Sequence, residues 1–483
     1  LSKGVFNMCG IVAFVDNEDP KVKDSLIRKM KNRIIHRGPD SEGQYVDENV
    51  ALGFRRLSFI DVKSGNQPIF NEDNSMAIEF NGEIYNFKEL REELIDLGHT
   101  FKTHADTEVI LHGYEQWGDD VLKRLRGMFA FVIWDFKNKD MFGARDHFGI
   151  KPLYYGKMNG TFFVGSEIKA FIDHPHFDKE LNKNALKPYM TFQYSATQET
   201  FFKGIYKLPE GHCFHYKDGQ FNMKEYWDAD FDPKDEGFDK AVDNIEDIVT
   251  DSVKAHSFAD KGIKVGSFLS AGVDSSYVTA MMRPDNTFSI GFDSTYDETK
   301  QARELAAKLN LKNTDAKLTN EEAFHTFPLI QYYLDEPDSN PSVIPLYFLT
   351  RLAKENGYKA MLSGEGADEL FAGYIDYGFN SNSMLIRWFT DKLRELPQAK
   401  RYKIAKWLDG KHFHGQLHMF RALAPVRESK FIGQAYIFSP EEAADVLQEK
   451  YNCGLTIDDI IDPILKNVED KDIDEVAKKQ YLD

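Results

Sequence analysis

The sequence predicts two domains, a layered α+β domain followed by an α/β domain built on a parallel sheet. From Cys9 to about residue 210 the chain consists mostly of short apolar or alternating runs, which are typical of strands. Residues 205–238 are rich in Gly, Pro and Asp, and beyond them helix-like and strand-like segments alternate. A length of 483 residues suits two domains and would admit three.

In the first domain, strands are expected at residues 9–15, 75–82, 128–135 and 162–168. Residues 20–34 and 86–98 instead carry apolar side chains three or four positions apart, and the second stretch ends in a glycine. This spacing is typical of amphipathic helices. The Lys-Asp-Gly-Gln sequence at 217–220 then predicts a β-hairpin, followed by a linker.

In the second domain, helices are expected at residues 238–256, 275–282 and 298–309, and strands at residues 263–270 and 287–292. This alternation predicts parallel strands joined by crossover helices. The chain beyond residue 380 is expected to be largely helical. The expected division is a first domain at residues 9–210, a hairpin and linker at 211–238, and a second domain at 239–483.

Composition narrows the class of protein. A net charge of −18 disfavours nonspecific binding to nucleic acid or to anionic membranes. The three cysteines, Cys9, Cys213 and Cys453, are far apart and form no CxxC pair, which favours a reducing cytoplasm. No apolar run reaches the roughly 18 residues that a membrane span needs. A homodimer stays open, because the sequence does not encode the oligomeric state.

Cys9 directly follows Met8 and opens an apolar strand. A cysteine at the N-terminus can act as a nucleophile with its own α-amine as the base, provided that the methionine is removed. A lone Met-Cys-Gly sequence more often marks a small buried residue. Under the catalytic interpretation, residues 1–8 are expected to be a leader or tag remnant that must be absent before Cys9 can act as a nucleophile.

Five further segments strengthen the catalytic interpretation: HRGPDSEG (36–43), RRLSFID (55–61), NGEIYNF (81–87), HADTEVIL (104–111) and RDHFGIKPLYY (145–155). In this order, and with Met-Cys-Gly-Ile before them, they resemble the class II glutamine amidotransferases, whose nucleophile is an N-terminal cysteine. The resemblance spans nearly the first two hundred residues and implies an N-terminal-nucleophile hydrolase fold, an αββα sandwich.

The resemblance implies specific roles for residues of this chain. Cys9 attacks the glutamine amide, and Asn81 with the Gly82 N–H forms the oxyanion hole. Arg56 binds the α-carboxylate, for which a guanidinium fork is well shaped. Asp106 and Glu83 hold the α-ammonium. The backbone of Leu57, Ser58, Phe59 and Ile60 completes the pocket, whereas His36, Arg37 and Asp146 are expected to be structural. Singly, these charged residues would be interpreted as surface charges and Asn81–Gly82 as a turn.

The second domain contains SAGVDSS at 270–276, between a predicted strand and a predicted helix. Such a loop offers hydroxyls, backbone N–H groups and a helix N-terminus to an anion. The sequence contains no GxxxxGK[ST] loop. The segment resembles the pyrophosphate loop of ATP pyrophosphatases, with an adenine nucleotide alpha hydrolase-like fold. Ala271 stands where that family usually has glycine, which is tolerated unless the position needs a positive φ.

FSIGF (288–292) and LSGEGADELFAGY (362–374) extend this resemblance. It implies that ATP contacts Leu269, Ser270, Gly272, Asp274, Ser275, Ser276, Ile290, Ser363 and Gly364. Glu365, in a catalytic role, and Asp368 would lie at the acyl-adenylate, and Asp274 and Asp368 would bind Mg²⁺.

A class II glutaminase followed by an ATP pyrophosphatase resembles the asparagine synthetase B family. The resemblance implies that glutamine supplies ammonia to a carboxylate adenylated by ATP, giving an amide, AMP and pyrophosphate. L-aspartate is the expected acceptor, and a meso-diaminopimelate carboxylate of peptidoglycan precursors is the alternative. The choice is open because Asp338, Ser339 and Pro341 replace the Thr-Thr and Arg of the best-known bacterial members.

Members of the family that the chain resembles normally continue past a segment like Tyr481–Asp483 into a lysine-containing stretch that contacts pyrophosphate. Either an incomplete C-terminus or a synthetase site without this phosphate contact is therefore expected. Two rival classes remain. A tRNA-modifying ATP pyrophosphatase would be expected to have a basic surface and paired cysteines. A non-catalytic relative would be expected to have lost some of Cys9, Arg56, Asn81, Asp106, Asp274 and Glu365, all of which are present.

Overall fold

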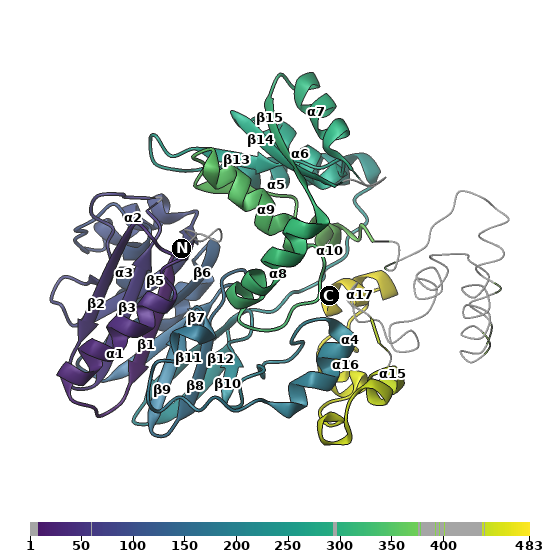
Figure 1. Cartoon of the computed structure of the whole chain (residues 1–483). Coiled ribbons are helices and arrows are strands. Elements are labelled where there is room, and N and C mark those ends of the chain that lie inside the picture. Colours follow the sequence, from purple (N-terminus) through teal and green to yellow (C-terminus); the bar gives the residue numbers. More distant parts are fainter. Residues whose placement is uncertain are drawn as a thin grey trace.

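The structure is a computed structural model of the chain. It describes residues 8–58, 60–292, 297–374 and 440–483, and also residues 377, 392, 396, 400, 437 and 438. The antiparallel sheets of the N-terminal half and the parallel sheet of the C-terminal half lie apart in Figure 1, with helices α8 (Asn320–Leu334) and α9 (Val343–Glu355) between them.

The N-terminal half contains two six-stranded antiparallel sheets. The first has the order β10-β8-β9-β1-β3-β2, with strands at Ile205–Lys207, Tyr154–Met158, Thr161–Gly165, Gly10–Val15, Val50–Arg56 and Ser41–Val46. The second has the order β12-β11-β7-β6-β5-β4, with strands at Gln220–Glu225, His212–Lys217, Asp140–Arg145, Gly127–Asp135, Met76–Ile84 and Ile69–Phe70. The four predicted strands of this half are therefore confirmed.

Three apolar cores stack these sheets and their helices into four layers. One core lies between the sheets and includes Leu52 and Trp134. A second packs helix α1 (Pro20–Arg33) on the first sheet, and a third packs α2 (Phe87–Asp96) and α3 (Thr107–Trp117) on the second. Burying one face of each sheet and one stripe of each helix in this way is the general solution for layered domains. The predicted αββα sandwich is confirmed.

The sequence analysis did not predict α3. All seven residues of 107–113 are buried, and the consecutive apolar residues 109–111 show no clear helical period in the sequence. The predicted hairpin does form, with Asp218 and Gly219 both at positive φ in its turn. Strand β11 pairs with β7, so the hairpin completes the second sheet rather than belonging to the linker.

The C-terminal half contains a four-stranded parallel sheet of order β15-β14-β13-β16, with strands at Lys312–Leu318, Asn286–Phe292, Val265–Phe268 and Ala360–Leu362. Helices α5 (Phe238–His256), α6 (Val273–Met282) and α7 (Thr299–Lys308) occupy the stretches that the sequence analysis assigned to helices. The predicted parallel α/β domain is confirmed. The carboxyl ends of its strands share one edge, where ligands bind in folds of this kind.

The remaining described helices are α4 (Leu186–Phe192), α10 (Ala367–Phe371), α15 (Pro440–Val446), α16 (Ile457–Lys466) and α17 (Glu475–Leu482), and single 3₁₀ turns lie at Gly118–Lys123, Ile168–Ala170, Lys183–Ala185 and Glu449–Tyr451. Phe192 of α4 packs with Ile457 and Ile461 of α16. The chain beyond residue 380 was expected to be largely helical. Most of its residues up to position 439 lie outside the described residues.

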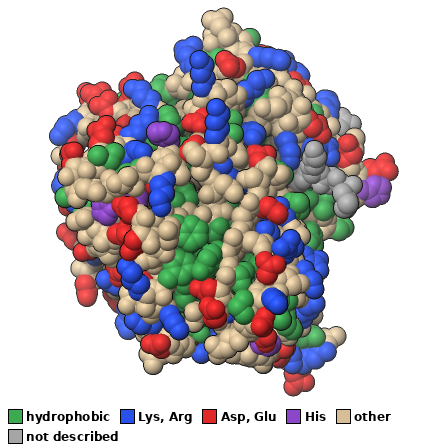
Figure 2. Space-filling model, turned by 90° about the vertical axis from the view of Figure 1, so that its left-hand side faces the viewer, with side chains coloured by type: hydrophobic (Ala, Val, Ile, Leu, Met, Phe, Trp, Pro, Cys, Tyr) green, Lys and Arg blue, Asp and Glu red, His purple; other side chains and the backbone are tan. Residues whose placement is uncertain are grey.

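Among the described helices, none has the length and apolar character that a membrane crossing requires. Acidic and basic side chains are interspersed over the face of the molecule shown in Figure 2, around a group of hydrophobic side chains.

Candidate active sites

Cys9 lies immediately before β1, and its thiol contacts the carbonyl of Leu57 at 3.6 Å. Burial raises the pKa of this thiol to about 11, and the charge of Glu83 raises it further, whereas Arg56 and Arg37 oppose the shift. The resting side chain is therefore a thiol, so a nucleophilic role requires a base. In the chain as described, Met8 precedes Cys9, which makes the Cys9 nitrogen a peptide amide.

Two buried side chains hold the Cys9 carbonyl. Arg37 Nε donates to it at 2.9 Å. With its amide oriented to satisfy both neighbours, Asn81 donates to the same oxygen at 3.0 Å and accepts from Arg37 Nη2 at 3.3 Å. A primary amide has two N–H donors, so one remains for another partner. Arg37, which the sequence analysis treated as structural, thus touches the backbone of the predicted nucleophile.

Glu83, half-buried on β5, lies close to Asp106, which is buried just before α3. Asp106 accepts a hydrogen bond from the Ile84 N–H at 2.9 Å, yet burial raises the pKa of its carboxyl to about 6. Burial and the charge of Asp106 raise the pKa of Glu83 well above its usual range, although Lys151 opposes this. Two neighbouring carboxylates in such a site are costly unless a cation joins them.

Arg56 is buried at the end of β3, and its guanidinium organises the following loop. Its nitrogens donate to the carbonyls of Ile60 at 3.0 Å, Asp61 at 2.6 Å and Val62 at 3.3 Å. Ser58 donates its backbone N–H to Asp40 at 2.9 Å. Phe59 lies outside the described residues. The predicted carboxylate-binding arginine is thus committed to backbone oxygens in the present arrangement.

Gly82 is set deep in the pairing of β5 with β6. A Cβ at this position would lie 2.2 Å from the carbonyl oxygen of Met128, so a side chain has no space here. The position therefore needs glycine for close approach of two backbones.

The serine-rich loop joins β13 to α6 and is tied together by its own hydroxyls. Ser270 Oγ lies 2.8 Å from Ser275 Oγ and accepts from the Gly272 N–H at 3.0 Å. Ser276 Oγ donates to the Gly272 carbonyl at 2.6 Å, and the backbone N–H of buried Leu269 donates to Phe288 at 2.9 Å. Ala271 has no positive φ, so its methyl group introduces no backbone strain.

The segment after β16 packs directly on this loop. A Cβ on Gly364 would lie 2.7 Å from the backbone carbon of Asp274, so these two segments of the backbone are in direct contact. Burial raises the pKa of Asp368, and the charges of Asp274 and Glu369 raise it further. Ser363 and Glu365 are exposed beside it, and the Glu365 N–H faces Ser363 Oγ at 3.5 Å.

The predicted nucleotide residues thus come together at the carboxyl ends of two adjacent parallel strands, β13 and β16. Ile290 lies on the neighbouring strand β14 and is half-buried against the core around Leu318. Asp274 and Asp368 are close enough to influence each other, and acidic pairs of this kind are typical Mg²⁺ ligands.

A buried chain of charges, which the sequence analysis missed, joins the Cys9 region to the second domain. Glu167 pairs with Arg37 at 2.9 Å, with His36 at 2.9 Å and with Lys169 at 2.6 Å. Lys169 in turn pairs with Asp335 at 2.7 Å, and Asp335 also accepts from the Ile168 N–H at 2.5 Å. The sequence offered one signal of this network: Glu167 and Lys169 stand two positions apart, just after the apolar strand β9.

Two further contacts support this connection. Glu336, next to Asp335, accepts from the Phe201 N–H at 2.9 Å. Lys359, which precedes β16, pairs with Asp40 at 2.7 Å and approaches the Ser58 carbonyl at 3.4 Å. Side chains of the second domain therefore contact the first domain at several points, including the segment at Ser58 in the predicted glutamine pocket.

Stacked antiparallel sheets with Cys9 at the head of a central strand, followed by a parallel sheet with a serine-rich loop, define a class II glutamine amidotransferase with a C-terminal synthetase domain. The model of the glutamine amidotransferase domain matches residues 8–227, and that of asparagine synthase matches residues 244–465. The chain belongs to the asparagine synthetase B-type family of glutamine-hydrolysing amidotransferases.

Among its relatives, asparagine synthetase [glutamine-hydrolyzing] 1 of Bacillus subtilis (strain 168) is 38% identical over 486 residues, with 99% of this chain and 75% of that protein covered. Asparagine synthetase [glutamine-hydrolyzing] 3 of the same organism is 29% identical, with 83% and 70% covered. A solved glutamine phosphoribosylpyrophosphate amidotransferase from B. subtilis has a TM-score of 0.35 and 14% identity, covering 77% of this chain and 94% of its own.

Proposed function

We propose that the chain converts L-aspartate to L-asparagine with nitrogen from glutamine and energy from ATP. The family establishes a glutamine-dependent amidating ligase. The observation that supports one coupled reaction best is the buried chain Arg37–Glu167–Lys169–Asp335, which connects the backbone of Cys9 with the synthetase domain.

In the glutaminase half of protein that begins at Cys9, the free α-amine takes the thiol proton and the Cys9 sulfur attacks the side-chain amide carbon of glutamine. The α-ammonium returns that proton to the leaving nitrogen, so ammonia departs and a thioester remains. Water then hydrolyses the thioester, which releases glutamate and restores the thiol. The second N–H of Asn81 and the Gly82 N–H stabilise the oxyanion. Asp106 and Glu83 bind the α-ammonium, whose charge favours the ionised form of both carboxyl groups. Arg56 exchanges at least one of its contacts with Ile60, Asp61 and Val62 for the glutamine carboxylate.

In the synthetase half, the acceptor carboxylate attacks the α-phosphorus of ATP and pyrophosphate leaves. Ammonia then attacks the acyl carbon and AMP leaves, so that each amide formed accompanies one AMP. The loop Ser270–Ser276 and the residues Ser363 and Gly364 bind the nucleotide, Ile290 faces the base, and Glu365 accepts the proton from the attacking ammonia. The carboxylates of Asp274 and Asp368 suit Mg²⁺, which supplies charge neutralisation at the phosphates when bound.

The acceptor is tested with amide-¹⁵N glutamine and ATP·Mg²⁺, using protein that begins at Cys9. One reaction contains L-aspartate and another a muropeptide precursor with meso-diaminopimelate. Labelled asparagine in a one-to-one ratio with AMP is the expected result. The comparisons give the diaminopimelate alternative no support, and label confined to the muropeptide would overturn the choice of aspartate.

A further inference from the structure

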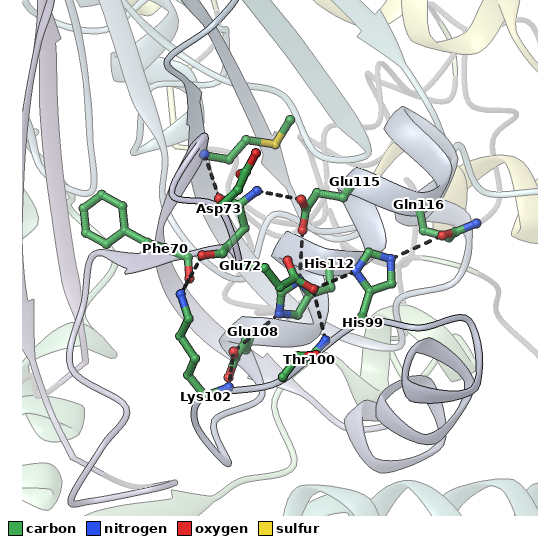
Figure 3. Close-up of polar contacts among 12 residues, drawn as sticks. Phe70, Glu72, Asp73, His99, Thr100, Lys102, Glu108, His112, Glu115 and Gln116 are labelled. Carbon is green, nitrogen blue, oxygen red and sulfur yellow. Dashed lines mark hydrogen bonds and ion pairs between the residues drawn. The ribbon is translucent and has the colours of Figure 1, made fainter.

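A second cluster of titratable side chains lies on α3 and on the two loops beside it, away from Cys9. Glu72 follows β4, His99 follows α2, and His112 and Glu115 lie one turn apart on α3. Figure 3 shows the two imidazole rings and the two carboxylates facing a common point. Separate elements therefore supply two histidines and two glutamates to one place.

The spacing of these side chains suits a metal ion. One ligand atom from each of the four residues lies within 4.8 Å of all the others. Glu72 lies 3.1 Å from His99 Nδ1 and 3.2 Å from His112 Nδ1, and Glu115 lies 2.9 Å from His112 Nδ1. Tetrahedral Zn²⁺ with ligand bonds of about 2.0–2.1 Å separates its ligand atoms by about 3.3 Å. The three contacts through Glu72 and His112 are already close to this separation, and the wider pairs would have to draw together by up to about 1.5 Å.

An outer ring of hydrogen bonds orients the four side chains. His112 Nε2 faces buried Glu108 at 3.4 Å, and the backbone N–H groups of Lys102 and Thr103 fix that glutamate at 2.7 Å each. Asn71 donates to Glu115 at 2.6 Å. A carboxylate behind a ligating histidine is a recurrent feature of protein zinc sites, where it fixes the ring and raises its basicity.

The charge of the cluster also favours a cation. Three carboxylates, Glu72, Glu108 and Glu115, surround the imidazole of His112. The ammonium of nearby Lys102 is directed instead at the carbonyls of Phe70 and Asn71. Negative charge in a partly buried site is stabilised by a paired or bound cation.

We propose that Glu72, His99, His112 and Glu115 form a structural site for Zn²⁺. The ion would fasten the turn after β4 and the loop after α2 onto α3. Asp106 immediately precedes α3, so the site would also fix one wall of the Cys9 pocket. This role goes beyond the amidation reaction and does not depend on which acceptor is used.

The test is a titration of chelator-treated, full-length protein with Zn²⁺ alone. It is followed by competition with a chromophoric chelator and by thermal unfolding, in a Cys9→Ala background that removes the pocket thiol. We expect one equivalent of Zn²⁺ to bind and to raise the unfolding temperature. Replacement by Co²⁺ should give the intense visible absorption of a tetrahedral site.

His99→Gln and Glu115→Gln should each lower Zn²⁺ affinity at least tenfold, and His99 is the safer substitution because it lies near the surface. His215→Gln is the matched control. His215 also lies between two carboxylates, Asp119 and Asp140, but has no second histidine, so Zn²⁺ affinity should be unchanged. Binding that is absent from the parent protein, or unchanged by His99→Gln, would overturn the proposal.

Discussion

At the scale of single residues, the protonation state of Asp106 is expected to control how tightly glutamine binds. Burial raises the pKa of its carboxyl from 3.8 to about 6, so lowering the pH through 6 protonates it within the range where enzymes are assayed. A protonated carboxyl loses its attraction for the glutamine α-ammonium. We therefore expect the KM for glutamine to rise as the pH falls from 7 to 5, while ammonia-dependent synthesis, compared at a constant concentration of free NH₃, shows no corresponding change.

Asp106→Asn tests the same assignment directly. The amide oxygen can still accept the hydrogen bond of the Ile84 N–H, but the charge is lost. Removing a charge-assisted contact costs about 1.5–3 kcal/mol, so the KM for glutamine should rise about 10- to 100-fold. The rise in KM between pH 7 and pH 5 should also disappear. A variant that kept this pH dependence would show that another group is responsible for it.

Arg37 is the residue whose importance the sequence analysis underestimated. Arg37→Lys keeps the charge but loses the fork that reaches both Cys9 and Glu167. A misplaced nucleophile can cost about 100-fold in rate, so glutamine hydrolysis should fall by this order. Steady-state measurement of glutamate release checks this expectation, and unchanged ammonia-dependent AMP formation is the control. An equal loss of both activities would mean that the variant is simply misfolded.

At the scale of elements, the loop between β13 and α6 explains how the chain accommodates alanine where the family usually has glycine. Ala271 has no positive φ, so glycine would bring no relief of strain. Ala271→Gly should leave the KM for ATP within about twofold and lower the free energy of unfolding by about 0.5–1 kcal/mol through added chain entropy. Tighter ATP binding by this variant would contradict the account of the loop.

Elements with a clear period were predictable from the sequence, and elements without one were not. Helix α1 and the hairpin at Asp218 and Gly219 follow directly from spacing and turn chemistry. Helix α3 was missed because its apolar residues 109–111 are consecutive, and such a short run does not distinguish a helix from a strand. The resemblance brought Cys9 and Asn81 together, but Glu167 and the cluster at His112 come from separate elements. Each of their charges, taken alone, is typical of a solvated surface.

At the scale of the whole molecule, the pair Lys169–Asp335 is the central link between the two halves. Both side chains are almost fully buried, so Asp335→Asn leaves Lys169 with Glu167 as its one carboxylate partner, beside the Tyr333 carbonyl at 3.2 Å. Breaking such a pair costs about 3–5 kcal/mol. We expect a lower unfolding temperature and more glutamate released per AMP formed, because hydrolysis would continue without synthesis.

Glu180→Gln is the matched control for that substitution. It breaks the ion pair with Lys203, in which both side chains are 62% exposed. Exposed pairs contribute at most about 1 kcal/mol, so neither the unfolding temperature nor the ratio of glutamate to AMP should change appreciably. If both variants behaved alike, the buried chain of charges would have no special part in joining the domains.

The central claim is that nitrogen released at Cys9 is the nitrogen consumed in the ATP-dependent step of the same chain. The most direct measurement follows ¹⁵N from the glutamine amide into the product while AMP is counted, in parent protein that begins at Cys9 and in its Cys9→Ala variant. The account predicts one labelled amide per AMP in the parent, and unlabelled amide in the variant when ammonium is added. Labelled amide from the variant, or glutamine hydrolysis without any ATP-dependent transfer in the parent, would contradict it.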